Sequence, residues 1–428
     1  MLFVLSQYAA IGARWINFAG TFMLHVLSRK PLSVWLLITS LYTTQFLGLS
    51  FFSVALVAIL RGQGASLEQV SSVYILGMIG ACKFLWAPLV DRVRFTSRIG
   101  HFRGWLLLMQ SLMVVVLCFL ANLDVTTDFG AIYLLCIVMA VCGATQDIAT
   151  DALVCSLLTE EERGMGNGIQ TAGGMFGFMV GAGLVLMAYP SLGWQKAVMI
   201  LAAGTAISLA QLIFFVEPEF KIQSRKGWQV ATRLVTFWQQ PGSLSWLAML
   251  LLFPVGITIA YSLLTPFLVD SLWPLERIGL IVNVFGPAMG IASSLFAGWL
   301  ISRFGRSKTM NYCIVMQFLS VVAVLFVVQG HVSTMAVVFA VVIHFLGYVP
   351  SVTMLSTLMM DRASRESPAT DYTVQFSVYQ FFAMGTGGLG MVMAGRLGYV
   401  GAIFGAIGCA VLAGFVAKFY ISKRVRCR

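Results

Sequence analysis

The chain has 428 residues, of which 59% are hydrophobic and only 10% are charged, and its mean hydropathy is +0.90. Soluble domains are about a quarter charged, so this composition excludes an ordinary water-soluble protein. The formal net charge of +11 would suit a nucleic-acid binder, but in a membrane protein a basic excess is typical of cytoplasmic loops, and we expect no nucleic-acid partner.

Apolar segments of about 20 residues recur along the whole chain, and a helix of that length crosses a hydrocarbon core about 30 Å thick. An outer-membrane barrel would instead alternate polar and apolar residues over segments of about ten residues, and the sequence shows no such alternation. The sequence therefore predicts an all-α membrane protein with about twelve transmembrane helices. Their approximate ranges are 34–60, 69–90, 104–122, 130–155, 166–189, 195–216, 244–269, 277–301, 309–329, 332–359, 372–394 and 398–420.

Residues 1–30 precede the first predicted span and are also apolar. One polar stripe at helical spacing runs along them, formed by Gln7, Arg14, Asn17 and Thr21. This stripe favours an amphipathic helix that lies on the membrane over a signal peptide or a thirteenth span. A start of translation at Met23, which would leave residues 1–22 unexpressed, is an alternative.

The distribution of basic residues predicts the orientation in the membrane. With both termini in the cytoplasm, 22 of the 27 Lys and Arg residues fall in cytoplasmic segments, and Lys83 lies within a span. Cytoplasmic loops are enriched in Lys and Arg, so this orientation is favoured over its inverse. The basic residues that remain outside are Arg61, Lys196, Arg277 and Arg396.

The longest polar interval, residues 217–243, separates six predicted spans from the other six. Its helical spacing predicts two faces, which suits an interfacial helix on the cytoplasmic side. The apolar face holds Trp228, Ala231, Val235 and Trp238, and the opposite face holds Arg225, Gln229, Thr232, Arg233 and Thr236.

The two sets of six spans resemble each other. Leu67–Val70 opens the second span much as Leu275–Ile278 opens the eighth, and Gln170 corresponds roughly to Gln375. Parallel six-helix repeats with a substrate site near the midplane are a transporter architecture, and chance similarity between apolar helices is the alternative. The expected domains are an N-terminal extension (1–30), an N-terminal six-helix bundle (31–216), a cytoplasmic linker (217–243), a C-terminal six-helix bundle (244–420) and a basic cytoplasmic tail (421–428).

Three charged residues, Lys83, Asp147 and Asp151, lie clearly within predicted spans, where each costs about 2.5–3.5 kcal/mol to insert. The two aspartates are four residues apart and share a helix face. We expect Lys83 to pair with one of them, and the spare carboxylate would then tend to take up a proton. A proton-coupling or substrate role is therefore favoured, and a structural ion pair that only joins two helices is the alternative.

Other chemistries find little support. The sequence has no Gly-x-x-x-x-Gly-Lys-Ser/Thr loop for ATP hydrolysis, and its four histidines have no clustered spacing for a metal site. The eight cysteines are typical of small hydrophobic residues rather than disulfides or metal ligands. We expect no enzyme activity, no metal and no cofactor. His344, the one histidine in a span, is expected to hydrogen-bond between helices rather than relay protons.

Two loops resemble the signature loop of the major facilitator superfamily, Gly-x-x-x-Asp-Arg-x-Gly-Arg-Arg/Lys. Residues 87–94 read Ala-Pro-Leu-Val-Asp-Arg-Val-Arg, with Ala87 in place of the first glycine. Residues 298–308 read Gly-Trp-Leu-Ile-Ser-Arg-Phe-Gly-Arg-Ser-Lys, with Ser302 in place of the aspartate. The resemblance implies that these loops pair charges between helix ends and stabilise one access state. The residues that would inherit this gating role are Asp91, Arg92, Arg303 and Arg306.

A narrower resemblance rests on residues 83–92, 144–152 and 161–164, which read Lys-Phe-Leu-Trp-Ala-Pro-Leu-Val-Asp-Arg, Ala-Thr-Gln-Asp-Ile-Ala-Thr-Asp-Ala and Glu-Glu-Arg-Gly. They look like the AmpG and acetyl-CoA transporter branch, whose members carry muropeptides, acetyl-CoA and, in shorter proteins, siderophores. Enterobacterial muropeptide permeases have additional C-terminal helices, whereas this chain stops soon after its twelfth span. This difference favours the siderophore permeases of the rhizobactin, pyochelin and yersiniabactin-associated type.

The resemblance implies proton-coupled uptake of a siderophore, free or as its metal chelate, or of a similar small polar metabolite. We expect a monomer in the lipid bilayer of the bacterial inner (cytoplasmic) membrane. Export is disfavoured because Ala182 stands where the antiporter signature of exporters has a proline. The alternatives are a muropeptide-type permease, a siderophore or drug exporter, and a transporter-like sensor protein. Five residues on helices that face the pathway in the resembled fold are expected to line the substrate cavity: Gln45, Gln146, Gln170, Asn283 and Gln375.

Overall fold

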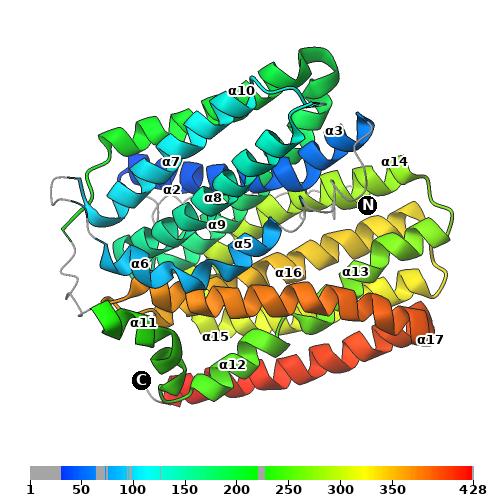
Figure 1. Ribbon diagram of the computed structural model, residues 1–428. Helices are drawn as coiled ribbons and strands as arrows, with labels where there is room; N and C mark the ends of the chain where they lie inside the picture. Colours follow the sequence, from blue (N-terminus) through cyan, green and yellow to red (C-terminus); the bar gives the residue numbers. More distant parts are fainter. Residues whose placement is uncertain are drawn as a thin grey trace, which may run out of the picture.

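The computed structural model describes residues 30–63, 73, 76–93, 95, 99–125, 127–219 and 227–426. Every regular element in these residues is a helix, which confirms the predicted fold class (Figure 1). The first elements are α2 (Leu32–Ser50), η1 (Phe51–Leu56), α3 (Val57–Gly62), α5 (Gly77–Cys82), η2 (Lys83–Leu85), α6 (Ala87–Arg92), α7 (His101–Leu120), α8 (Phe129–Leu157), α9 (Arg163–Phe178), η3 (Met179–Leu184) and α10 (Val185–Phe214). They are followed by α11 (Gly227–Thr236), η4 (Phe237–Gln239), α12 (Ser243–Leu252), α13 (Val255–Asp270), α14 (Leu275–Ile278), η5 (Gly279–Phe285), α15 (Gly286–Val328), α16 (Thr334–Arg362) and α17 (Pro368–Arg426).

Three long helical runs are each divided by a glycine. Gly193 in α10, Gly305 in α15 and Gly398 in α17 have φ angles of +73°, +77° and +72°, a backbone conformation that strains any residue with a side chain. The 59 residues of α17 would reach about 90 Å if they were straight, about three times the thickness of a hydrocarbon core. Figure 1 shows that α17 instead crosses the bundle and returns.

The number of crossings agrees with the prediction. Within the described residues, eight helical runs are long and apolar enough to cross a membrane. The three glycines divide three of these runs, which makes eleven segments. The described part of the predicted second span, residues 76–90 in α5, η2 and the start of α6, is the twelfth, and residues 69–72 and 74–75 of that span lie outside the described part of the chain.

The helix of the second span is interrupted at Lys83, the charged residue within it. α5 ends at Cys82, a single tight turn follows at Lys83–Leu85, and α6 begins at Ala87 with Pro88 in its first turn. Proline lacks an N–H donor and clashes with the preceding helical turn, so it interrupts one helix and suits the start of the next. Lys83 therefore lies at a helix break in the interior of the protein, where it is 1% exposed.

The linker contains the predicted helix, but its polar face is not entirely turned to solvent. Arg233 of α11 donates through Nε and Nη2 to the carboxylate oxygens of Asp371, at 2.7 and 2.9 Å. A buried carboxylate needs a cation, and the planar guanidinium supplies two parallel hydrogen bonds. Arg233, expected on the polar face, therefore joins the linker helix to α17. Val235, expected on the apolar face, is 63% exposed, and the side chain of Trp228 lies outside the described residues.

Two sequence predictions fall on parts of the chain outside this description. The expected N-terminal amphipathic helix lies in residues 1–29, and the motif Leu67–Val70 lies in the interval 64–70. At the other terminus, α17 continues to Arg426, beyond the predicted end of the last span at residue 420. The basic tail therefore begins as part of that helix.

The N-terminal half (residues 30–219) and the C-terminal half (residues 227–426) meet at one end of the bundle, where α6, α8 and α16 end and α9 and α17 begin. We call it the Asp91 end. A Cβ atom on Gly168 of α9 would lie 2.7 Å from the backbone carbonyl oxygen of Ser294 in α15. A Cβ atom on Gly298 would lie 3.0 Å from the carbonyl oxygen of Gly164. Glycine therefore allows the two halves to pack backbone against backbone here.

Candidate functional site

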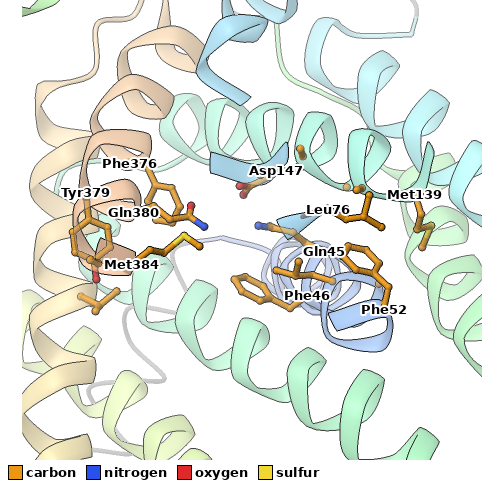
Figure 2. Close-up of a pocket in the computed structure, with 18 of the residues that line it drawn as sticks. Gln45, Phe46, Phe52, Leu76, Met139, Asp147, Phe376, Tyr379, Gln380 and Met384 are labelled. Carbon is orange, nitrogen blue, oxygen red and sulfur yellow. The ribbon is translucent and has the colours of Figure 1, made fainter. Parts of the chain in front are cut away.

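A cavity of about 450 Å³ lies between the two halves. Figure 2 shows Phe376, Tyr379, Gln380 and Met384 of α17 on one side and Gln45, Phe46 and Leu76 on the other, with Asp147 between the two sides. A second cavity of about 230 Å³ adjoins it, because six residues line both. These shared residues are Gln45, Phe46, Asp147, Tyr348, Val352 and Phe376.

The structure brings two of the three predicted charged residues into direct contact. Lys83 Nζ donates to Asp147 Oδ2. Lys83 does not line either cavity, whereas Asp147 is 7% exposed and lines both. The wall of the cavity therefore holds a carboxylate whose counter-ion is buried behind it.

Asp151 lies one helical turn further along α8 and is buried away from both cavities. Its Oδ1 accepts hydrogen bonds from Tyr42 Oη at 2.9 Å and from Gln170 Nε2 at 3.1 Å. Gln170 Nε2 also lies 3.5 Å from Tyr372 Oη, on the C-terminal half. Sequence reasoning missed both tyrosines, because a tyrosine in an apolar span is common and nothing local shows that it faces a carboxylate.

The predicted cavity residues divide into two groups. Gln45 lines both cavities and Gln170 lines the smaller one. Gln146 is instead buried against α2, where its Nε2 donates to Leu41 O and Thr44 Oγ1. Gln375 accepts from Trp246 Nε1 and donates to two backbone carbonyls.

Gln146 and Gln375 therefore depart from the expectation, because their side-chain amides hydrogen-bond to neighbouring helices and do not line either cavity. The side chain of Asn283 lies outside the described residues. Four further polar residues, Thr258, Tyr348, Tyr379 and Gln380, line the larger cavity.

Asp91, predicted to act in a gating loop, joins the two halves. Its carboxylate accepts from the backbone N–H groups of Ala369 and Thr370 at 3.1 and 2.8 Å, and from Thr370 Oγ1 at 2.6 Å. These are N–H groups in the first turn of α17, which have no partner within their own helix. Arg92, the next residue, is exposed at the surface.

The second gating loop contributes Arg306 to a charge cluster at the same end. Arg306 donates to both carboxylate oxygens of Asp361 at 3.1 and 3.2 Å and to the carbonyl oxygen of Glu160 at 2.6 Å. Arg163, on the N-terminal half, binds Asp361 as well, at 3.2 Å. No sequence signal singles out Asp361, because it lies just beyond the predicted span 332–359, where a charge is ordinary. Arg303 is exposed.

Asp91 lies beyond the predicted second span, and we expect it to make closure at this end depend on pH. Burial raises the pKa of Asp91 to about 7, against the opposing effect of its hydrogen bonds to Thr370 and Ala369, whereas an exposed aspartate titrates near 3.9. The closed state therefore binds the proton more tightly. Protonation of Asp91 stabilises the closed state relative to the open state. This stabilisation is fully present below about pH 4 and is lost as the pH rises through about 7.

Spin labels at the exposed Val93 and Ser307, one on each half, can measure closure by the distance between them. The closed fraction should rise as the pH falls from about 8 to about 5. Asp91→Asn should remove this dependence. A closed fraction that rises with pH in the unsubstituted protein would contradict the prediction.

His344 is buried within the C-terminal half. Its Nδ1 lies 3.3 Å from Ser320 Oγ, and its ring stacks on Tyr261 with centroids 3.8 Å apart. This contact joins α15 to α16, in agreement with the expected helix–helix hydrogen bond.

The sequence pattern of the Major Facilitator Superfamily matches residues 34–391. The chain belongs to this superfamily. Its long apolar helices are those of a multi-pass membrane protein, as in the transporters of this family.

Among known proteins, the anhydromuropeptide permease of Escherichia coli (strain K12) is 30% identical over 268 residues, which is 62% of this chain and 54% of that protein. The chain thus spans about half the length of that relative. A putative transporter, AmpG 4, of Rickettsia felis is 23% identical over 74% of this chain and 79% of its own length. These relatives agree with the resemblance to the AmpG branch.

Solved structures confirm the fold. The human organic anion transporter MFSD10 (TETRAN) superimposes with a TM-score of 0.68 at 16% identity, over 91% of this chain and 100% of that one. FucP, in an outward conformation, gives a TM-score of 0.67 at 13% identity, over 90% of this chain and 98% of that one.

Proposed function

We propose that this protein is a proton-coupled uptake transporter of the bacterial inner membrane that works by alternating access. The observation that carries this proposal is the ion pair of Lys83 and Asp147, in which the aspartate faces a cavity between the two halves. An intramembrane charge is costly and is typical of proton or substrate pathways. The proposed moving units are the two six-helix bundles, residues 31–216 and 244–420, joined by the linker 217–243.

The positive-inside distribution of Lys and Arg supports a cytoplasmic location for both termini and the linker. In that orientation the Asp91 end is cytoplasmic. The Asp91 bonds to α17, the cluster around Asp361 and the contact of Gly168 with Ser294 then close the cytoplasmic side. The structure would accordingly correspond to an outward-facing state.

A proton that reaches Asp147 through the cavity neutralises its carboxylate. Its attraction to Lys83 is then weakened, while the carboxyl group of Asp151, which interacts electrostatically with both groups, remains beside the buried ammonium. The Lys83–Asp147 attraction that favours closure at the cytoplasmic end is thereby reduced, and the two six-helix bundles can move relative to each other. Asp147 is the proposed entry point for the proton, and Asp151 shares the coupling from behind.

The favoured cargo is a siderophore, free or as its metal chelate, or a polar metabolite of comparable size. Among the described residues that line the larger cavity, Asp147 alone carries a charge, and many of the others are aromatic rings or methionines. Such a lining suits a solute with a flat apolar body and a few polar groups. The proposed partners are this solute, protons and the lipid bilayer, and the proposed state is a monomer without metal or cofactor.

Muropeptide uptake is the second candidate, because a relative named anhydromuropeptide permease is 30% identical over much of the chain. We expect cells that lack the gene, and have no other importer, to lose uptake of a labelled aromatic siderophore and growth that depends on it. Uptake of a labelled anhydromuropeptide should be unchanged. The reverse pattern would reject the siderophore proposal in favour of muropeptide recycling.

A further inference from the structure

The ammonium group of Lys83 contacts both halves of the protein. Its Nζ binds Asp147 in the N-terminal half and lies 4.6 Å from the ring centroid of Phe376, which belongs to α17 in the C-terminal half. The negative face of an aromatic ring attracts a cation, and most strongly where water is excluded. The buried cation is therefore shared between an anion of one half and a ring of the other.

Neighbouring aromatic contacts hold the Phe376 ring in this position. It lies between Tyr372 and Tyr379 on α17, with centroid distances of 6.2 and 6.0 Å. Phe84, the residue after Lys83, meets Phe381 of α17 edge-on at 6.4 Å. The ring therefore parts from Lys83 when α17 moves relative to the second span, and not by a side-chain rotation alone.

Phe376 also lines both cavities. The same ring thus contacts the buried charge pair and borders the space available to cargo. We propose that Phe376 is a positioning residue that couples the Lys83–Asp147 pair to closure of the two halves. The inference rests on the proposed transport function. When α17 moves away, Lys83 loses its contact with the Phe376 ring and keeps Asp147 as its partner. Cargo bound against Phe376 and a proton bound to Asp147 therefore both change the contact between Lys83 and the Phe376 ring.

Fluorinated phenylalanines at position 376 test this inference. One, two or three fluorine atoms nearly preserve the shape of the ring but withdraw electron density from its face in steps. With spin labels at Val93 and Ser307, the ratio of closed to open molecules should fall with each fluorine. Over the whole series this ratio should fall about 30-fold if a desolvated cation–π contact is lost. Phe376→Leu should lower the ratio at least as much.

Two matched controls separate attraction from packing. The same fluorine series at Phe381, which meets the ring of Phe84 edge-on, should show a much smaller trend, because a contact between two neutral rings depends less on the charge of the ring face than a contact with an ammonium does. In a Lys83→Met background the trend at position 376 should disappear. A flat series at position 376, or an equal trend in either control, would overturn the inference.

The test also separates this inference from the proposed function. If Asp147→Asn still accumulates cargo, proton coupling at that residue is rejected, while a fluorine trend in closure would still support the role of Phe376. If Asp147→Asn abolishes accumulation and the fluorine series is flat, coupling stands and the role of Phe376 is rejected.

Discussion

Asp147→Asn is expected to abolish accumulation of cargo against its gradient while leaving exchange of cargo across the membrane intact. Asparagine has nearly the shape of aspartate and can still accept from Lys83, but it cannot take up a proton. The proton gradient then has no group in the cavity wall through which to drive transport, since Asp147 is the charged residue among the described lining. Accumulation and counterflow in proteoliposomes measure the two properties separately.

Asp151→Asn should impair accumulation less. Asp151 is buried away from the cavities, and its bonds from Tyr42 and Gln170 go to Oδ1, which an asparagine oxygen can replace. Accumulation at the level of the unsubstituted protein in both aspartate variants would show that the charges only join helices.

Breaking the buried pair from the lysine side provides a control on folding. Lys83→Met leaves Asp147 without its cation, and loss of one partner of a buried pair costs about 3–5 kcal/mol. The double variant Lys83→Met with Asp147→Asn removes both charges and should recover most of the lost thermal stability in detergent. Equal melting temperatures of the single and double variants would contradict an energetically coupled pair.

Gly168→Ala is expected to prevent full closure of the Asp91 end and to reduce transport strongly. The added Cβ would lie 2.7 Å from the carbonyl oxygen of Ser294, a backbone atom of the opposite half that cannot rotate away. Overpacking of this kind costs about 1–3 kcal/mol, and every 1.4 kcal/mol changes an equilibrium about tenfold. The ratio of closed to open molecules should therefore fall about 5- to 150-fold, measured by the distance between labels at Val93 and Ser307.

Gly183→Ala is the matched control for that substitution. It lies in η3, directly after α9, and a Cβ there would meet no atom within 4 Å. The control should close and transport normally. If both alanine variants behave alike, general helix propensity and not the contact between halves determines the effect.

The membrane class, the helical fold and the approximate spans could be predicted from the amino-acid pattern, because a helix must be about 20 apolar residues long to cross a bilayer and this signal is local. It also singled out Lys83 and Asp147, because a charge within such a segment is costly wherever the partner lies. Spacing could not decide which aspartate Lys83 would bind, because both lie on one face of α8.

The tertiary structure alone decided which polar side chains border the cavity and which join helices. Gln45 and Gln146 look alike in sequence, yet Gln45 faces the cavity and Gln146 bonds to α2. Asp361 and Asp371 lie at predicted span ends, where charges are ordinary, and their arginine partners are between 55 and 198 residues away in sequence. Phe376 carries no charge at all, and its place over Lys83 follows only from the packing of the two halves. Hydrogen bonds, ion pairs and ring contacts between distant segments depend on that packing, and a local sequence pattern does not contain it.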